Sequence, residues 1–133
     1  MTEIRLSVGD VEILAECNDS ETSRALIEAL PFESRGSYWG GEFYFDTPVT
    51  CDEAPDASEV VDPGTVAYWP PGACLCLFWG PTPASRGSEC RAASKVNVVG
   101  RVTNPELLPT LRSRKVRVSL PEHTQTSGAP ASS

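Results

Sequence analysis

Cysteines, arginines and a dense set of aromatic residues are the side chains of this sequence that could take part in chemistry. Cys74 and Cys76 lie two positions apart, so on a strand they would point to the same face and could share a soft metal ion. A closed zinc site needs two further ligands. Cys90 is available, but His123, the single histidine, lies near the C-terminus. We therefore expect small buried thiols, no metal site and no cofactor.

The composition narrows the class of protein. The 133-residue chain is 40% hydrophobic and carries a net charge of −7, which is typical of one acidic globular domain. Such a charge argues against nucleic acid or an anionic membrane surface as a partner. No apolar run is long enough to span a bilayer, and the N-terminus resembles no secretory signal. The five cysteines then indicate reduced thiols and a cytoplasmic location. A serine or cysteine nucleophile would lack a positioned histidine base.

Alternating apolar and polar residues predict a mainly β fold. Residues 4–8 and 11–17 form a hairpin pattern, and residues 21–30 have helical spacing that ends at Pro31. A second, short helix is expected at 105–111. Further strands are expected at 42–45, 48–51, 65–69, 73–79, 95–102 and 115–120, with an exposed acidic loop at 52–62. About eight short strands in so small a chain favour a closed barrel. Residues 1–120 would form this domain, and 121–133, rich in Ser, Thr and Pro, a disordered tail.

Nine of the ten aromatic residues lie in two segments, 38–45 and 68–79, which we expect to meet in space. They could form a shared core, or they could line a groove. In the strand at 73–79, Leu75 and Leu77 point away from Cys74 and Cys76, so both faces are apolar. One face must be inside the barrel, and the other must be covered by a helix, a partner or a ligand groove. The aromatic side chains assigned to the groove are Trp39, Phe43, Phe45, Tyr68, Trp69 and Phe78.

Three long stretches resemble a small prokaryotic family of stand-alone cyclophilin-like domains, which are atypical relatives of the peptidyl-prolyl isomerases. They read PFESRGSYWGGEFYFDTPV, DPGTVAYWPPGACLCLFWGPTP and SKVNVVGRV. The similarity extends from about residue 3 to residue 120. It implies a closed eight-stranded barrel with helices covering its open ends.

The resemblance does not extend to the usual catalytic side chains. In cyclophilins a strand arginine beside the proline pocket assists rotation about the X–Pro bond, but the strand that resembles it, 42–47, has no arginine and places Phe45 or a neighbour there. The position of the family's pocket histidine resembles Val96. Arg35, Arg91 and Arg101 are possible replacements, and Asn97 is a further polar group in an apolar strand.

We therefore expect a cyclophilin-like domain whose aromatic groove binds an apolar small molecule or a proline-containing peptide. Its binding residues would include Arg35 and Asn97 beside the aromatic set, and any isomerase activity would be weak. The alternative is a non-catalytic ligand-binding module or a homodimer that buries the apolar outer face.

Overall fold

The computed structural model describes residues 2–121. Of the tail expected at 121–133, residues 122–133 lie outside this range, and Pro121 is buried. Within these residues, nine strands and one α-helix follow one another, with a short 3-10 helix after β6 and a second before β9. Their bounds are β1 Thr2–Val8, β2 Val11–Cys17, α1 Glu21–Glu28, β3 Phe32–Tyr38, β4 Glu42–Asp46, β5 Ser58–Val61, β6 Thr65–Trp69, η1 Pro70–Gly72, β7 Cys74–Phe78, β8 Cys90–Val102, η2 Pro105–Thr110 and β9 Lys115–Ser119.

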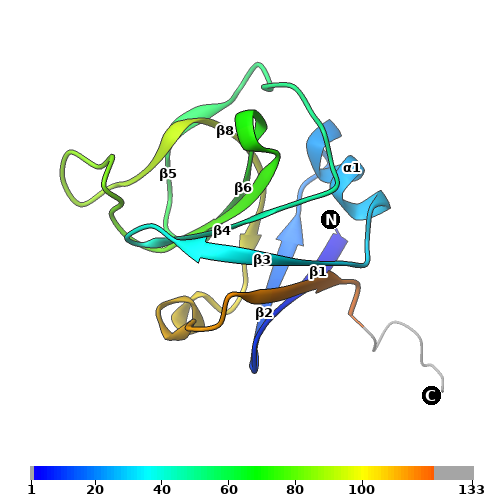
Figure 1. Cartoon of the computed structure of the whole chain (residues 1–133). Coiled ribbons are helices and arrows are strands. Elements are labelled where there is room, and N and C mark those ends of the chain that lie inside the picture. The colour runs from blue at the N-terminus through cyan, green and yellow to red at the C-terminus, as the bar shows by residue number, and fades with distance from the viewer. Residues whose placement is uncertain (1, 122–133) are drawn as a thin grey trace, which may run out of the picture.

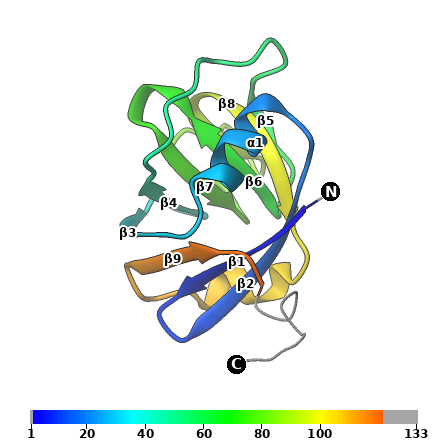
Figure 2. The same ribbon diagram turned by 90° about the vertical axis from the view of Figure 1, so that its right-hand side faces the viewer.

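Eight of the strands form a closed ring in the order β2-β1-β9-β3-β4-β7-β6-β8, with β2 pairing back onto β8 (Figure 1). This confirms the predicted mainly β, closed eight-stranded architecture. β5 pairs with the first half of the long strand β8, whereas the second half of β8 pairs with β6 and β2 (Figure 2). β8 thus belongs to the ring and also forms, with β5, a small sheet outside it.

The helix α1 and the 3-10 helix η2 lie on opposite sides of the ring (Figure 1). The Ser20 side chain caps α1 by accepting a hydrogen bond from the Ser23 backbone N–H at 3.2 Å. Leu26 of α1 and Leu108 of η2 are both buried in the main core. Both helices expected from the sequence, at 21–30 and 105–111, are therefore present, the second as a 3-10 helix.

Two strands were missed by the sequence prediction, and one predicted strand is absent. β3, FESRGSY, carries charged residues at Glu33 and Arg35 and shows little apolar alternation, yet it pairs with both β4 and β9. β5 lies within the segment 52–62, which was expected to be a loop. Residues 48–51 form no strand; there the Thr47 hydroxyl and the Val49 backbone hydrogen-bond to each other in a turn.

The apolar side chains form two clusters. The larger one fills the ring and contains Leu75 and Leu77, while the smaller one contains Cys76 and Phe78. The two faces of β7 are therefore both buried, as the alternation predicted. The outer face is covered by β5 and the first half of β8.

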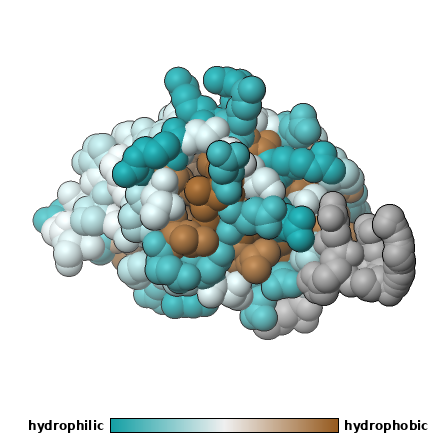
Figure 3. Space-filling view, turned by 90° about the horizontal axis from the view of Figure 1, so that it is seen from below, coloured by the Kyte–Doolittle hydropathy of each residue, from teal (hydrophilic) through white to brown (hydrophobic). Residues whose placement is uncertain are grey.

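Polar side chains cover most of the face seen in Figure 3, where hydrophobic atoms form small patches between hydrophilic ones. The large hydrophobic residues exposed among the described residues are Val60, Val98 and Leu120. In the described part of the chain, no helix has the length and apolar character required to cross a bilayer.

Candidate functional site

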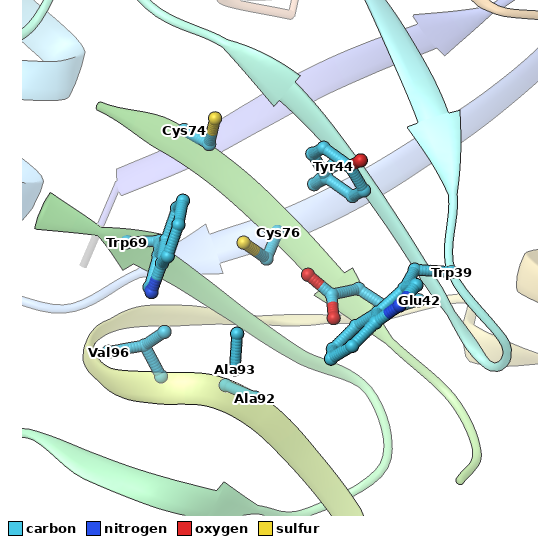
Figure 4. A pocket seen from close by; sticks show the side chains of 9 residues that line it. All are labelled: Trp39, Glu42, Tyr44, Trp69, Cys74, Cys76, Ala92, Ala93 and Val96. Carbon is cyan, nitrogen blue, oxygen red and sulfur yellow. The ribbon is translucent and has the colours of Figure 1, made fainter. Parts of the chain in front are cut away.

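A pocket of about 160 Å³ lies outside the ring, between its outer face and the first half of β8 (Figure 4). That is about the volume at which a protein cavity accommodates one benzene-sized molecule. Its walls come from the turn before β4 and from β4, β6, β7 and β8. The lining residues are Trp39, Glu42, Tyr44, Trp69, Cys74, Cys76, Ala92, Ala93 and Val96.

The strand register explains why a hollow forms here. Across β4, β7 and β6, Tyr44 pairs with Cys76, and Cys74 pairs with Trp69, so small thiols stand beside large rings. Side chains of alternate residues share one face of a strand, which places Tyr44 with Glu42 and Cys74 with Cys76. The small side chains form the floor of the pocket and the aromatic rings its walls.

A tight turn brings Trp39 next to Glu42. The backbone N–H of Trp39 donates to the carbonyl of Glu42 at 2.8 Å. Gly41 lies so close to Gly80 that a Cβ on Gly41 would come within 2.5 Å of a backbone atom of Gly80. Glycine at position 41 therefore permits the close approach that places both side chains in the pocket.

Trp69 is held on the opposite side of the pocket from Trp39 (Figure 4). Its indole N–H donates a hydrogen bond of 2.7 Å to the hydroxyl of Ser94, which belongs to β8. This bond fixes the ring and uses its only donor, so the indole offers its apolar surface to the cavity.

Glu42 is the unusual polar group of this pocket. The side chain is only 5% exposed, and its Oε1 atom has no hydrogen-bond partner among the described residues. Its carboxyl group points into the space between Trp39 and Cys76 (Figure 4). Burial penalises the carboxylate and raises the pKa of Glu42 to about 7, while the nearby Cys76 thiol has a smaller lowering effect. The acid can therefore gain or lose a proton near neutral pH.

The thiols of the pocket are poor nucleophiles. Burial raises the pKa of Cys74 to about 11 and that of Cys76 well above its usual value, and the neighbouring acids Asp46 and Glu42 act in the same direction. All five cysteines of the chain are free thiols. Within residues 2–121, no group of three or more His, Cys, Asp or Glu side chains is arranged to hold a metal ion.

Two of the eight predicted site residues, Trp39 and Trp69, line this pocket. Phe43, Phe45 and Tyr68 belong to the main core instead, with exposed fractions of 1% or less. The phenol of Tyr68 donates to the carbonyl of Val49 at 2.7 Å. These three residues lie on the inner face of the ring, whereas the other three aromatic residues assigned to the groove lie outside it.

The other three predicted site residues lie elsewhere. Phe78 is fully buried in the outer cluster. Arg35 is exposed on β3, where it pairs with Lys115 of β9, outside the pocket. Asn97 is 2% exposed, and all of its polar atoms are engaged. Its amide donates to Thr22 Oγ1 and to the carbonyl of Asp52 and accepts from the N–H of Ala54, so Asn97 has a structural role here.

The other arginines considered do not replace the missing catalytic residue in the pocket. Arg91 forms ion pairs with Glu89 at 3.0 Å and Glu59 at 3.2 Å, and Arg101 is exposed on another surface. Among the described residues that line the pocket, none is an arginine or a histidine.

Sequence reasoning missed the central residue of the site, Glu42, together with Tyr44, Ala92 and Ala93. Val96, which the resemblance placed at the position of the family's pocket histidine, does line this pocket. Side chains of alternate residues share one face of a strand, so β4 carries Glu42 and Tyr44 on one face and Phe43 and Phe45 on the other. Glu42 and Tyr44 could have been identified from the sequence, because an acidic residue is unusual at the start of an aromatic strand. β8 adds Ala92, Ala93 and Val96 to the lining of the pocket. They reach it because the first half of β8 runs outside the ring, where it pairs with β5.

Comparisons with known proteins agree with the architecture. Residues 2–119 match a family model described as cyclophilin-like. The chain is 37% identical to the hypothetical protein AF2241 from Archaeoglobus fulgidus, whose solution structure superposes with a TM-score of 0.77 over 90% of this chain and 95% of that one. A comparison with curated proteins found no match. Because the family model spans nearly the whole chain, the protein belongs to the cyclophilin-like family.

Proposed function

We propose that this domain binds a small ligand whose apolar part enters the pocket between Trp39 and Trp69, and that it does so without catalysing a reaction. The observation that carries the proposal is an apolar, aromatic-walled cavity that contains one buried acid, one of whose oxygens has no partner in the part of the chain that the structure describes. Buried polar atoms are almost always hydrogen-bonded, and a ligand with one complementary polar group would satisfy this one.

The size and lining of the pocket limit the ligand. A volume of about 160 Å³ accommodates one small group, such as a proline ring or a branched alkyl group. Trp and Tyr suit this role because they present a large apolar surface with little loss of conformational entropy. An apolar small molecule and a proline-containing peptide both meet these limits.

Isomerisation of an X–Pro bond is the alternative that the family relationship suggests. The pocket would accept a proline ring, and isomerisation needs no covalent chemistry. However, the described lining residues provide no arginine to stabilise the rotated amide. Binding without catalysis is therefore the function that the site supports best.

Titration of the isotope-labelled protein with neutral probes would test the proposal. With tert-butanol and N-acetylproline methylamide, we expect saturable shifts of the indole N–H signals of Trp39 and Trp69, but not of Trp79. Ala93→Leu would fill the pocket from its exposed rim and should abolish the shifts. Val98→Leu adds bulk on the same strand outside the pocket and should leave them unchanged. Shifts that survive Ala93→Leu, or no saturable shift with either probe, would contradict the proposal.

A homodimer stays a prediction. The apolar outer face on which it rested is covered within the chain by β5 and β8. Val60 and Val98 are exposed and line a hollow on the surface, where they could contribute to a dimer contact. Sedimentation at increasing protein concentration would detect a dimer, and a monomer at high concentration would exclude it.

A further inference from the structure

The walls of the pocket have the composition of a site for an organic cation. Trp39 and Trp69 stand on opposite sides of the cavity, and the ring of Tyr44 lies above the space between them (Figure 4). The faces of aromatic rings carry partial negative charge, and cages of such rings attract alkylated ammonium groups. Because the indole N–H of Trp69 donates to Ser94, this polar group is already engaged and the ring presents its apolar face to the ligand.

The acid inside the cavity strengthens this preference. Glu42 contributes a carboxyl group whose Oε1 atom is buried and unpartnered among the described residues. A carboxylate only accepts hydrogen bonds, so the group that completes it must be a donor, and a charged donor gives the stronger bond. An ammonium ion with one N–H and small alkyl substituents meets the demands of both the acid and the rings.

The charges around the pocket also favour a positively charged ligand. Of the described residues that line the pocket, none is a lysine, an arginine or a histidine. The nearest arginine along β8, Arg91, is paired with Glu59 and Glu89. The net charge of the chain is −7, which would also attract a cation from solution.

We propose that the pocket binds the ammonium group of a small N-alkylated amine, with its N–H on Glu42 Oε1 and its alkyl groups against Trp39 and Trp69. This inference rests on the proposed ligand-binding function and narrows it to one class of ligand. A neutral apolar group would fill the same volume but would leave the acid without a charged partner.

Binding should then depend on pH, because a cation favours the ionised form of Glu42. With a pKa of about 7 in the empty pocket, the affinity should be about tenfold weaker near pH 6 than near pH 8. The other titratable groups that face Glu42 are Tyr44 and Asp46 on its own strand, Cys74 and Cys76 on β7, and Cys90 on β8. Burial raises the pKa of each of the three thiols, so they stay protonated over this range.

A comparison of two probes of similar shape would test the proposal with the full chain. Trimethylammonium chloride and neutral tert-butanol are titrated near pH 8, with sodium chloride as the ionic-strength control, and binding is followed by tryptophan emission and indole N–H shifts. We expect trimethylammonium to bind at least tenfold more tightly than tert-butanol. Equal or tighter binding of tert-butanol would overturn the cation inference and leave the proposed ligand-binding function intact. Binding of neither probe would overturn both.

Two variants separate the contributions of charge and of the rings. Glu42→Gln should reduce the affinity for trimethylammonium at least tenfold and remove its pH dependence, while the affinity for tert-butanol stays the same. Glu33→Gln makes the same charge change on an exposed residue of β3 and should have no effect. Trp39→Leu keeps an apolar wall but removes the aromatic ring. It should reduce the affinity for trimethylammonium more than the affinity for tert-butanol. Trp79→Leu is its control outside the pocket. Unchanged binding of trimethylammonium in both Glu42→Gln and Trp39→Leu would contradict the inference.

Discussion

The indole of Trp69 and the hydroxyl of Ser94 form a 2.7 Å hydrogen bond that joins β6 of the ring to the part of β8 that lies outside it. Trp69 lies on the side of the pocket opposite Trp39 (Figure 4), so the bond holds one aromatic wall in place before any ligand arrives. Preorganisation of this kind lowers the entropy cost of binding.

Ser94→Ala tests the importance of this bond. The variant leaves the Trp69 N–H without its partner, and we expect the free energy of unfolding to fall by about 1 kcal/mol. Binding of a pocket ligand should also weaken, because the ring is free to turn. Urea unfolding and ligand titration measure the two effects. Ser88→Ala, in the exposed loop before β8, is the control, and an equal effect in both variants would argue against a specific role for the bond.

The pH dependence of stability should reveal the buried acid. Burial raises the pKa of Glu42 from 4.5 to about 7, so the folded state holds this proton more tightly than the unfolded state does. Its contribution to stability is present in full below about pH 4.5 and is lost as the pH rises to about 7, with a change of up to about 3 kcal/mol. Urea unfolding between pH 5 and pH 8 should show this decline.

Glu42→Gln should remove most of that decline and should be more stable than the natural chain near pH 8. Glu89, whose pKa is lowered to about 2 by hydrogen bonds from the Arg86 backbone and the Arg91 side chain, acts in the opposite direction. Its contribution is lost only as the pH falls below about 4.5, so the two effects occupy different pH ranges. A decline that persists unchanged in Glu42→Gln would show that another group causes it.

Asn97→Ala should destabilise the protein without altering the pocket. The substitution leaves the backbone N–H of Ala54, the carbonyl of Asp52 and the hydroxyl of Thr22 without their partner. We expect a loss of about 2–3 kcal/mol in the free energy of unfolding. Ligand affinity, measured where both proteins are folded, should be unchanged. A loss of ligand affinity with unchanged stability would show that Asn97 contributes to ligand binding, as the sequence predicted.

Phe45→Ala and Trp39→Ala should separate the core from the pocket. Phe45 is 1% exposed inside the ring, and its truncation should cost about 3–5 kcal/mol because it leaves a cavity. Trp39 is partly exposed at the turn before β4, so its truncation should reduce ligand binding and cost much less stability. Thermal unfolding and titration of both variants provide the comparison. If Phe45→Ala abolished binding while stability stayed normal, the assignment of the two faces would be wrong.

Exchange spectroscopy on an X–Pro peptide would test for isomerase activity. The uncatalysed barrier is about 18–20 kcal/mol, and the described residues of the pocket contain no arginine to lower it. We expect no acceleration of cis–trans exchange at high protein concentration. Acceleration that disappears in Glu42→Gln would instead indicate that the protonated acid donates to the peptide during rotation.

The sequence alone determined the class of fold and the alternation of its strands. Apolar periodicity defined the first hairpin, α1 and most of the later strands, because each of these carries its own pattern of burial. The motif YWPPGACLCLFWGPTP carried the family relationship, which the family model confirms. β3 and β5 were missed because they carry little apolar alternation of their own, and each pairs with a strand far along the chain, β3 with β9 and β5 with β8.

Only the tertiary structure decided which face of each strand forms the site. Alternation has a period of two and divides Phe43 and Phe45 from Glu42 and Tyr44, but it does not say which pair is inside. The large phenylalanines entered the ring, and the acid and the tyrosine were left on the outer face. That face became a pocket because β8 extends beyond the ring and covers it, which is a long-range arrangement that no local pattern records.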